Sequence, residues 1–519
     1  MSTRTRTATL FATLLVLLGG EVLADLSNED FDKAKKLVAS SDAAQQKEGV
    51  RMLGQANSRR AVDLLVRLLT VPNLDSGVED AAIDALGKTT DEEALDLLVQ
   101  KAASGPWNVR AALISALART GSEKAQDALI RYAEATDPIV RTFAIDALGE
   151  MKCVKAIPSI AKTLNGASTP WQVRVSAAQA LARIFHNDCV DPLIQALKKC
   201  EEGRVKEEIE SSLFALTGKQ MPTPAVWESW WSANKGLPLT GPGLARDGQG
   251  GERKDGRDDG GQVVGAPPGE GDTTAGPTYY GIRIRSKRLV FVIDISGSMQ
   301  EAITRTPNIQ APPPVASGAN PGAPQPNQVD YSKIKTKVEL AKFELIRAIR
   351  SLPQDAHFNV IFYSTEVSEW KQGLVPATDG NKADAIKKVE SFAADGLTNI
   401  YGALEKAFMM HSGQEPGNDQ GKEMTVAPAD YKQGVDTIFF LTDGWPTTGK
   451  TLNGITPMNS GNMQNAFAYR DELLKVVGEW LQIRKIKVNT IGISNSPGEH
   501  DGELLRKLAE MSGGTYVAP

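Results

Sequence analysis

The sequence predicts an all-α helical solenoid followed by an α/β domain with a doubly wound parallel sheet. In the N-terminal half, a sequence motif of apolar and small residues recurs every 31 to 33 residues. In the C-terminal half, short apolar runs alternate with helical segments. A stretch rich in glycine, proline and charge separates the two halves. The chain has 519 residues, which is too long for a single core, so we expect several domains.

Residues 1–24 have the features of a secretory signal peptide. Arg4 and Arg6 supply a positive start, and the apolar stretch 8–18 is too short to span a bilayer with ease. Small residues at 22–24 suit a signal peptidase, although an uncleaved membrane anchor is the alternative. No later segment is long and apolar enough to cross a membrane. We therefore expect an exported protein, located in the periplasm, in the cell envelope or outside the cell.

Composition argues against two kinds of partner. The net charge of −5 and a pI near 5.7 disfavour a nucleic-acid-binding surface. No basic amphipathic stretch is present to hold the chain to an anionic membrane. The three cysteines, Cys153, Cys189 and Cys200, have the spacing of neither a zinc site nor a disulfide framework. We expect them to be small buried thiols between packed helices.

Residues 25–238 contain an internal repeat. Four phrases superimpose without gaps: VEDAAIDALG (78–87), VRAALISALA (109–118), VRTFAIDALG (140–149) and VRVSAAQALA (173–182). Apolar residues in each copy fall at i, i+4, i+7 and i+8, which is one face of a helix. Second helical stretches lie between the phrases, at 61–69, 93–102, 125–133, 156–164 and 189–199. A single helix pair of this size cannot bury its apolar face, so the copies must stack into a solenoid.

This pattern resembles HEAT-like repeats, including the opening Asp137-Pro138-Ile139-Val140-Arg141 of one helix. Such solenoids serve mostly as scaffolds. Three arginines recur at one repeat position: Arg110, Arg141 and Arg174. We interpret them as a ladder of hydrogen bonds to helix ends and carboxylates, the alternative being a basic stripe for an acidic ligand. Three tryptophans end the region: Trp227, Trp230 and Trp231. We expect them to cap the solenoid rather than to form an aromatic ligand platform.

Residues 239–279 offer almost nothing apolar to bury, so we expect a disordered, flexible linker there. From residue 280 to 519 strand-like and helical segments alternate, which predicts a Rossmann-like parallel sheet covered on both faces. The expected strands are 288–294, 358–364, 435–443 and 487–494. The expected helices are 337–352, 382–392, 400–410, 468–484 and 502–512. A Pro-rich insertion, 300–335, and a polar loop, 412–433, interrupt the pattern.

Five oxygen-bearing residues of this domain follow apolar runs, at points where turns are expected. They are Asp294, Ser296 and Ser298 in VFVIDISGSM, Thr398 in GLTNI, and Asp443 in IFFLTDGW. Ligands of open α/β sheets bind at the carboxyl ends of the strands, where Asp294 and Asp443 are expected. Small, hard oxygen atoms are the ligands that Mg²⁺ prefers. The sequence therefore predicts a divalent-cation site at this edge, unless these side chains only cap strand and helix ends.

The segment 288–519 closely resembles the von Willebrand factor type A domain with its metal ion-dependent adhesion site. In that family the first Asp, two Ser, the Thr and the second Asp surround a divalent ion, directly or through water. The resemblance implies this role for the five residues, with Mg²⁺ as the expected ion and Mn²⁺ or Ca²⁺ as alternatives. Leu397 departs from the family, which often has glycine before the threonine. The insertion 300–335 directly follows the loop that holds Ser296 and Ser298, so we expect it to affect how a partner reaches the site.

Two carboxylates and three hydroxyls leave a divalent ion incompletely neutralised, with room for water or a partner's Asp or Glu. We expect an exported, non-enzymatic protein-binding scaffold, with the repeats as a second interaction surface. One alternative is a metal-dependent hydrolase, which would need a general base. None of the four histidines is next in sequence to a segment that holds a predicted metal ligand. No P-loop, G-x-S-x-G or H-E-x-x-H motif is present. A further alternative is a lyase or chaperone-like protein that uses the HEAT-like repeats.

Overall fold

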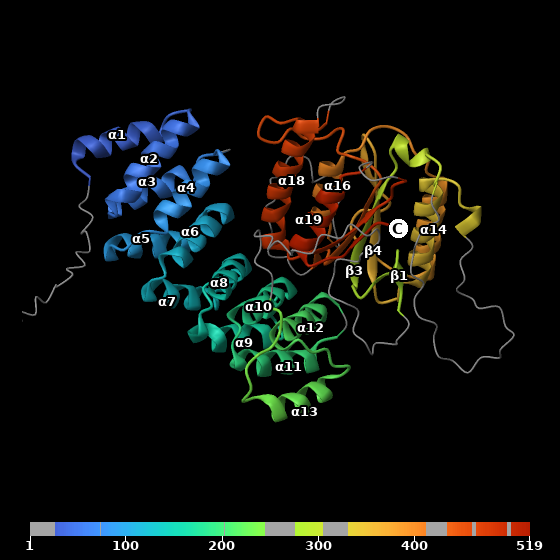
Figure 1. The fold of residues 1–519 in the computed structure, drawn as a ribbon, viewed down its shortest axis with the longest axis horizontal. Coiled ribbons are helices and arrows are strands. Elements are labelled where there is room, and N and C mark those ends of the chain that lie inside the picture. Colours follow the sequence, from blue (N-terminus) through green and yellow to red (C-terminus); the bar gives the residue numbers. More distant parts are fainter. Residues whose placement is uncertain are drawn as a thin grey trace, which may run out of the picture. The chain divides into compact units, whose positions relative to one another are not determined.

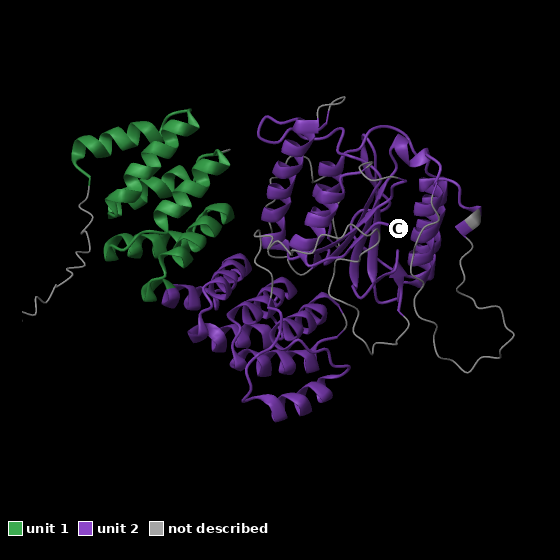
Figure 2. Cartoon of the chain, in the orientation of Figure 1, with its two compact units in different colours: residues 1–125 green, residues 126–519 purple. Residues whose placement is uncertain are grey.

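The computed structural model describes eight stretches of the chain (Figure 1): residues 26–72, 74–201, 203–243, 276–304, 331–411, 433–458, 463–495 and 500–519. The expected signal peptide, most of the expected linker and most of the insertion 300–335 lie outside these residues. The chain divides into two compact units, residues 1–125 and residues 126–519 (Figure 2). In the part of the chain that the structure describes, no helix is both long enough and apolar enough to cross a membrane.

The first unit consists of stacked helix pairs. Its helices are α1 (Asn28–Val38), α2 (Ala43–Ala56), α3 (Arg59–Leu68), α4 (Ser76–Leu86), α5 (Glu92–Ala102), α6 (Trp107–Thr120) and the start of α7 (Glu123–Tyr132). Helix α4 packs on α2 and on α6, with wholly buried Val78, Ala82 and Leu86 at its core. Aspartates 42, 75 and 91 cap α2, α4 and α5 by accepting hydrogen bonds from backbone N–H groups. The predicted two-helix repeat is confirmed here.

The second unit continues the repeat. Its remaining solenoid helices are α8 (Pro138–Glu150), α9 (Ile157–Asn165), α10 (Trp171–Ile184), α11 (Val190–Lys199), α12 (Arg204–Thr217) and α13 (Pro224–Asn234). Arg141 donates to Thr163 Oγ1 at 3.2 Å, and Arg174 Nε donates to the Leu164 carbonyl at 2.9 Å. The Leu164 carbonyl belongs to the last turn of α9, so the interpretation as hydrogen bonds to helix ends is confirmed for Arg174, whereas Arg141 bonds to a side-chain hydroxyl of the same turn.

Two of the three tryptophans that end the repeat region and two of the three cysteines are buried, as expected. Trp227 and Trp231 of α13 are buried, and α13 packs on α11, so these two rings close the end of the helical stack. Cys153 and Cys189 are buried free thiols. Cys200 is half-buried and accepts a hydrogen bond from Arg174.

The rest of the second unit is built on a mostly parallel sheet of order β5-β4-β3-β7-β8-β9, with β6 also paired to β4. Its strands are β3 (Arg288–Asp294), β4 (His357–Tyr363), β5 (Val367–Glu369), β6 (Val375–Pro376), β7 (Thr437–Thr442), β8 (Lys487–Gly492) and β9 (Tyr516–Val517). Strands β4, β7, β8 and β9 run parallel to their inner neighbours, whereas β5 and β6 are antiparallel to β4. The reversal of strand order beside β3 places the predicted binding edge at the carboxyl ends of β3 and β7.

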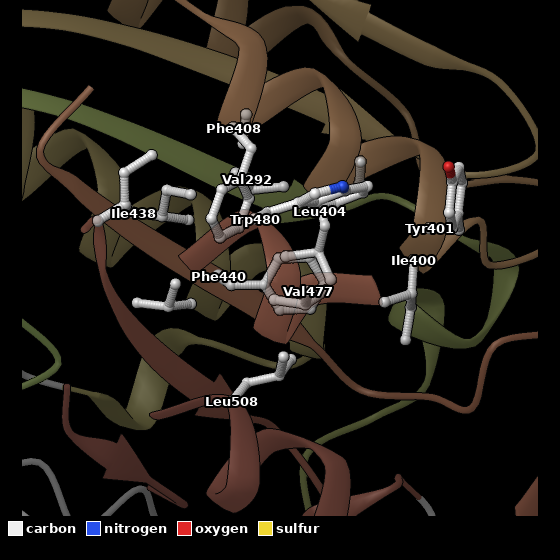
Figure 3. Close-up of a cluster of buried hydrophobic side chains, with 14 of the residues drawn as sticks. Val292, Ile400, Tyr401, Leu404, Phe408, Ile438, Phe440, Val477, Trp480 and Leu508 are labelled. Carbon is white, nitrogen blue, oxygen red and sulfur yellow. The ribbon is translucent and has the colours of Figure 1, made fainter. Parts of the chain in front are cut away.

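Helices cover both faces of this sheet. They are α14 (Lys337–Ser351), α15 (Asp379–Ser391), α16 (Ile400–Met409), α18 (Met463–Arg484) and α19 (Gly502–Ser512). Alternate residues of β3 enter two separate cores: Phe291 packs with residues of α14 and α15, and Val292 packs with residues of α16, α18 and α19 (Figure 3). The predicted doubly wound arrangement is confirmed.

The sheet domain begins slightly earlier than residue 280. Strand β1 (Thr278–Tyr279) pairs with β2 (Ile282–Arg283), and the Tyr279 ring is wholly buried against Phe291 and Phe439. Burial of an aromatic ring stabilises a fold strongly, which explains why the last residues of the expected linker are ordered against the core.

Charged contacts join the repeats to the sheet within the second unit. Lys485 Nζ lies 2.7 Å from Asp146, Lys487 Nζ lies 3.2 Å from Glu207, and Arg285 lies 2.7 Å from Glu210. Lys487 opens β8 and Arg285 follows β2, so these contacts lie at the amino end of the parallel strands. None of these three contacts lies at the opposite edge of the sheet, where Asp294 ends β3.

Candidate metal centre

Adjacent parallel strands bring the two predicted aspartates to one edge of the sheet. Asp294 is the last residue of β3, and Asp443 directly follows β7, which is paired with β3 in parallel. Asp294, Ser296, Thr398 and Asp443 are all buried, with at most 4% of each residue exposed. Ser298 is half-buried in the 3-10 turn Gly297–Gln300. The site is therefore a recessed cluster of oxygen atoms.

Hydrogen bonds link four of the five predicted residues in one chain. Ser298 Oγ donates to Asp443 Oδ1 at 2.7 Å and lies 3.1 Å from Ser296 Oγ. The Ser296 backbone N–H donates to Asp294 Oδ1 at 2.8 Å. The other oxygen of Asp294 accepts from Thr442 Oγ1 at 2.6 Å. The two serine hydroxyls thus lie between the two carboxylates.

Thr398 reaches the same cluster from the loop before α16. A Cβ atom placed on Gly444 would lie 3.5 Å from Thr398 Oγ1 and 3.9 Å from Ser298 Oγ, so both hydroxyls face this glycine. The Thr398 backbone N–H donates to Thr447 Oγ1 at 2.8 Å, which ties the loop to the segment after β7. Asn399, rather than Thr398, caps α16. Helix capping therefore does not explain the threonine.

The departure at Leu397 does not remove the threonine from the site. The preceding residue, Gly396, has a φ of +87°, a backbone conformation that favours glycine. The Gly396 carbonyl accepts a 3.0 Å hydrogen bond from the Gly297 N–H. This bond directly joins the loop that holds the two serines to the loop that holds Thr398. The conformational freedom of glycine is thus supplied one residue earlier, and the Leu397 side chain remains 51% exposed.

Sequence comparisons fit this geometry. Residues 329–518 match the sequence model of the von Willebrand factor type A domain. HEAT repeats match at 32–106 and 97–169, and a PBS lyase HEAT-like repeat matches at 173–199. The chain carries a type A domain preceded by HEAT repeats. Strand β3 and its Asp294 precede the matched stretch, and the sheet order adds them to the domain as its central strand.

Two curated relatives illustrate the likeness. Inter-alpha-trypsin inhibitor heavy chain H6 of Homo sapiens is 30% identical over 173 residues, which are 32% of this chain and 12% of that protein. Heavy chain H3 of Mesocricetus auratus is 27% identical over 171 residues, or 33% of this chain and 14% of that protein. The chain thus spans about an eighth of the length of these relatives. A solved von Willebrand factor type A structure from Catenulispora acidiphila is 18% identical, with 45% of this chain and 39% of that chain covered at a TM-score of 0.27.

Both carboxylates of the cluster have raised pKa values. Burial, and secondarily the charge of Asp443, raises the pKa of Asp294 to about 6. Burial also raises the pKa of Asp443. The charge of Asp443 disfavours the charged form of Asp294, and a divalent ion bound between them would favour the charged forms of both carboxylates. Among the described residues no group of three or more His, Cys, Asp or Glu could hold a metal ion. The five predicted ligands offer two carboxylates and three hydroxyls.

One charged neighbour was not predicted from the sequence. The side chain of Lys337, the first residue of α14, is 2% exposed, and its Nζ lies 3.1 Å from Asp443 Oδ2 and 2.6 Å from Glu301 Oε2. Burial lowers the pKa of this ammonium, but the hydrogen bonds and charges of Glu301 and Asp443 outweigh burial and raise it overall. The lysine therefore stays charged. Its sequence signal was its place on the buried stripe of α14 with Leu340, Ala341 and Leu345.

Proposed function

We propose that this chain is an exported, non-enzymatic scaffold whose type A domain binds a divalent cation and docks a carboxylate of a protein partner. The observation that carries the proposal is the convergence of the predicted oxygen ligands at the carboxyl edge of the sheet. They are Asp294, Ser296, Ser298, Thr398 and Asp443. The bound ion, for which Mg²⁺ is the first choice and Mn²⁺ or Ca²⁺ are alternatives, supplies positive charge that a partner's acidic side chain recognises.

The charges around the cluster favour an acidic partner. Asp294 and Asp443 are the two carboxylates among the five proposed ligands, and Lys337 already pairs with Asp443 and offsets part of its negative charge. Glu301 offsets Lys337, but its side chain is 56% exposed and therefore partly screened by solvent. A carboxylate arriving from outside completes both the charge balance and the oxygen coordination of the ion.

The positions of the histidines favour binding over hydrolysis. His357 begins β4, whereas the carboxyl end of that strand, Tyr363, pairs with Asp294, so roughly 20 Å of strand separates them. His500 is buried and lies 3.1 Å from the Tyr516 hydroxyl. His411 bridges to Gly434 outside the ligand loops. His186 belongs to the repeats. A metal-dependent hydrolase would need a base near the cluster, and no histidine is placed to provide one.

Export and a second interaction surface complete the proposal. The residues 1–24 have the pattern of a signal peptide. HEAT repeats stack into extended surfaces that suit a scaffold. The curated relatives named above are heavy chains of an inhibitor, which agrees with a binding role rather than catalysis.

Mg²⁺ titration of the full chain by calorimetry tests the metal half of the proposal. We expect one ion per chain, and at least a tenfold loss of affinity in Thr398→Ala, because the threonine hydroxyl faces the cluster. Ser391→Ala is the control, since Ser391 is an exposed residue of α15 whose hydroxyl donates to the Lys388 carbonyl. No heat of binding in the unmutated chain, or equal affinity in Thr398→Ala, would contradict the proposed site.

Affinity capture tests the partner half. Immobilised full chain is incubated with native envelope extract in Mg²⁺ and then washed with a chelator. We expect a defined protein to be retained in Mg²⁺, released by the chelator and absent from the Asp443→Ala bait. If the same proteins are retained by both baits regardless of chelator, the metal does not mediate docking.

A further inference from the structure

Lys337 lies in a position that ordinarily disfavours a charged lysine. It is the first residue of α14, where the positive end of the helix dipole opposes a cation. It is also one of the largest wholly buried side chains of the described residues, and burial of an ammonium is costly unless it is paired. Two carboxylates offset both costs, one on each side of the Nζ atom: Asp443 and Glu301.

The two carboxylates differ in kind. Asp443 is fully buried and is one of the proposed ligands of the cation, whereas the Glu301 side chain is 56% exposed and lies outside the five ligand residues. The backbone holds Lys337 and Glu301 side by side. The Lys337 N–H donates to the Glu301 carbonyl at 3.1 Å, and Ala302 bridges to Thr336. The ammonium of Lys337 therefore has two partners. A metal ion would also bind Asp443, the buried partner, whereas Glu301, the exposed partner, would still be free to pair with the ammonium.

We propose that Lys337 is a built-in counter-cation that competes with the divalent ion for Asp443, and that Glu301 retains the ammonium when the ion binds. This inference rests on the proposed metal site. Without an ion, the ammonium neutralises Asp443 and keeps it oriented. With an ion, repulsion between the two cations shifts Lys337 toward Glu301. The lysine thereby sets an upper limit on metal affinity, and binding stays reversible.

Substitutions of Lys337 and of Glu301 are expected to change Mg²⁺ affinity in opposite directions. Lys337→Met keeps the length and apolar stem of the side chain but removes the competing charge, so we expect the full chain to bind Mg²⁺ at least tenfold more tightly. The same variant should melt at a lower temperature in EDTA, because Asp443 loses its counter-charge. Glu301→Gln removes the outer carboxylate and leaves the ammonium closer to Asp443, so we expect Mg²⁺ affinity to fall severalfold.

A double-mutant cycle separates competition from simple charge effects. If Glu301 acts by holding Lys337, the Glu301→Gln substitution should change Mg²⁺ affinity much less in the Lys337→Met background than in the unmutated chain. Lys342→Met is the matched control on the same helix, because Lys342 donates to the backbone carbonyls of Glu390 and Phe392. It should leave Mg²⁺ affinity unchanged.

Calorimetry with Mg²⁺ and melting in EDTA distinguish the outcomes. Tighter binding with lower EDTA stability in Lys337→Met supports the inference, whereas a purely structural lysine would lower both quantities. If the unmutated chain binds Mg²⁺ and Lys337→Met binds no more tightly, this inference alone is overturned. If only the variant binds, the competition is supported in its strongest form. If neither binds, the proposed metal site fails as well. Should Lys337→Met not fold, unchanged or tighter binding by Glu301→Gln overturns the inference, and weaker binding supports it.

Discussion

Asp294→Asn is expected to stabilise the metal-free chain and to abolish its response to Mg²⁺. The Asp294 carboxylate is wholly buried, and burial, followed by the charge of Asp443, raises its pKa to about 6. This folded-state pKa lies above the ordinary value of 3.8, so ionisation of Asp294 lowers the stability of the folded chain. The loss of stability is absent below about pH 4 and develops as the pH rises through 6. At pH 7.5 it amounts to up to about 3 kcal/mol. A neutral asparagine avoids it.

Melting temperatures at several pH values, in EDTA and in millimolar Mg²⁺, measure both effects. In EDTA the advantage of Asp294→Asn over the unmutated chain should grow between pH 4 and pH 7.5. In Mg²⁺ the unmutated chain should gain stability and the variant should not, because the ion has lost a charged ligand. Asp379→Asn makes the same chemical change at an exposed carboxylate at the start of α15 and should do neither. A variant that is less stable in EDTA, or that still responds to Mg²⁺, would contradict the assignment.

The sequence predicted the regular parts of the fold well because their signals are local. The run 288–294 became β3 with the same bounds, since seven consecutive residues suit a buried parallel strand. The short strands β5, β6 and β9 were not predicted. Each has two or three residues, too few for a period, and each forms only by pairing with a strand that is already in place.

The ligand set could be predicted, but its surroundings could not. Asp294 ends β3 and Asp443 directly follows β7, so the parallel pairing of these two strands brings the aspartates together. Lys337 and Glu301 approach each other across the expected insertion 300–335, and the bridge between Ala302 and Thr336 that joins them is a long-range pairing without a local signal. The helical period places Lys337 on the buried stripe of α14, but it does not reveal which carboxylates pair with the ammonium.

Trp480→Ala is expected to produce the largest loss of stability among the substitutions considered, about 3–5 kcal/mol for the type A domain. The indole of Trp480 on α18 is 6% exposed, and its ring centroid lies 5.7 Å from that of Tyr401 and 5.4 Å from that of Phe408 on α16 (Figure 3). Its removal leaves a cavity between two helices that cover one face of the sheet. The melting temperature of this domain, followed by circular dichroism, should fall by roughly 10 °C.

The same substitution should also weaken the metal site, because α16 follows Thr398 directly and Tyr401 lies in its first turn. A looser α16 allows the threonine loop to move, and a small displacement of a ligand lowers affinity. We therefore expect Mg²⁺ affinity to fall in Trp480→Ala at a temperature where the variant is still folded. Met463→Ala, at the exposed start of the same helix, should change stability by no more than about 0.5 kcal/mol and leave Mg²⁺ binding intact. If Trp480→Ala melts like the unmutated chain, the packing of α18 on α16 does not support the domain. If it melts early but binds Mg²⁺ as tightly as before, the threonine loop is held by its own hydrogen bonds to the Thr447 segment rather than by the helix.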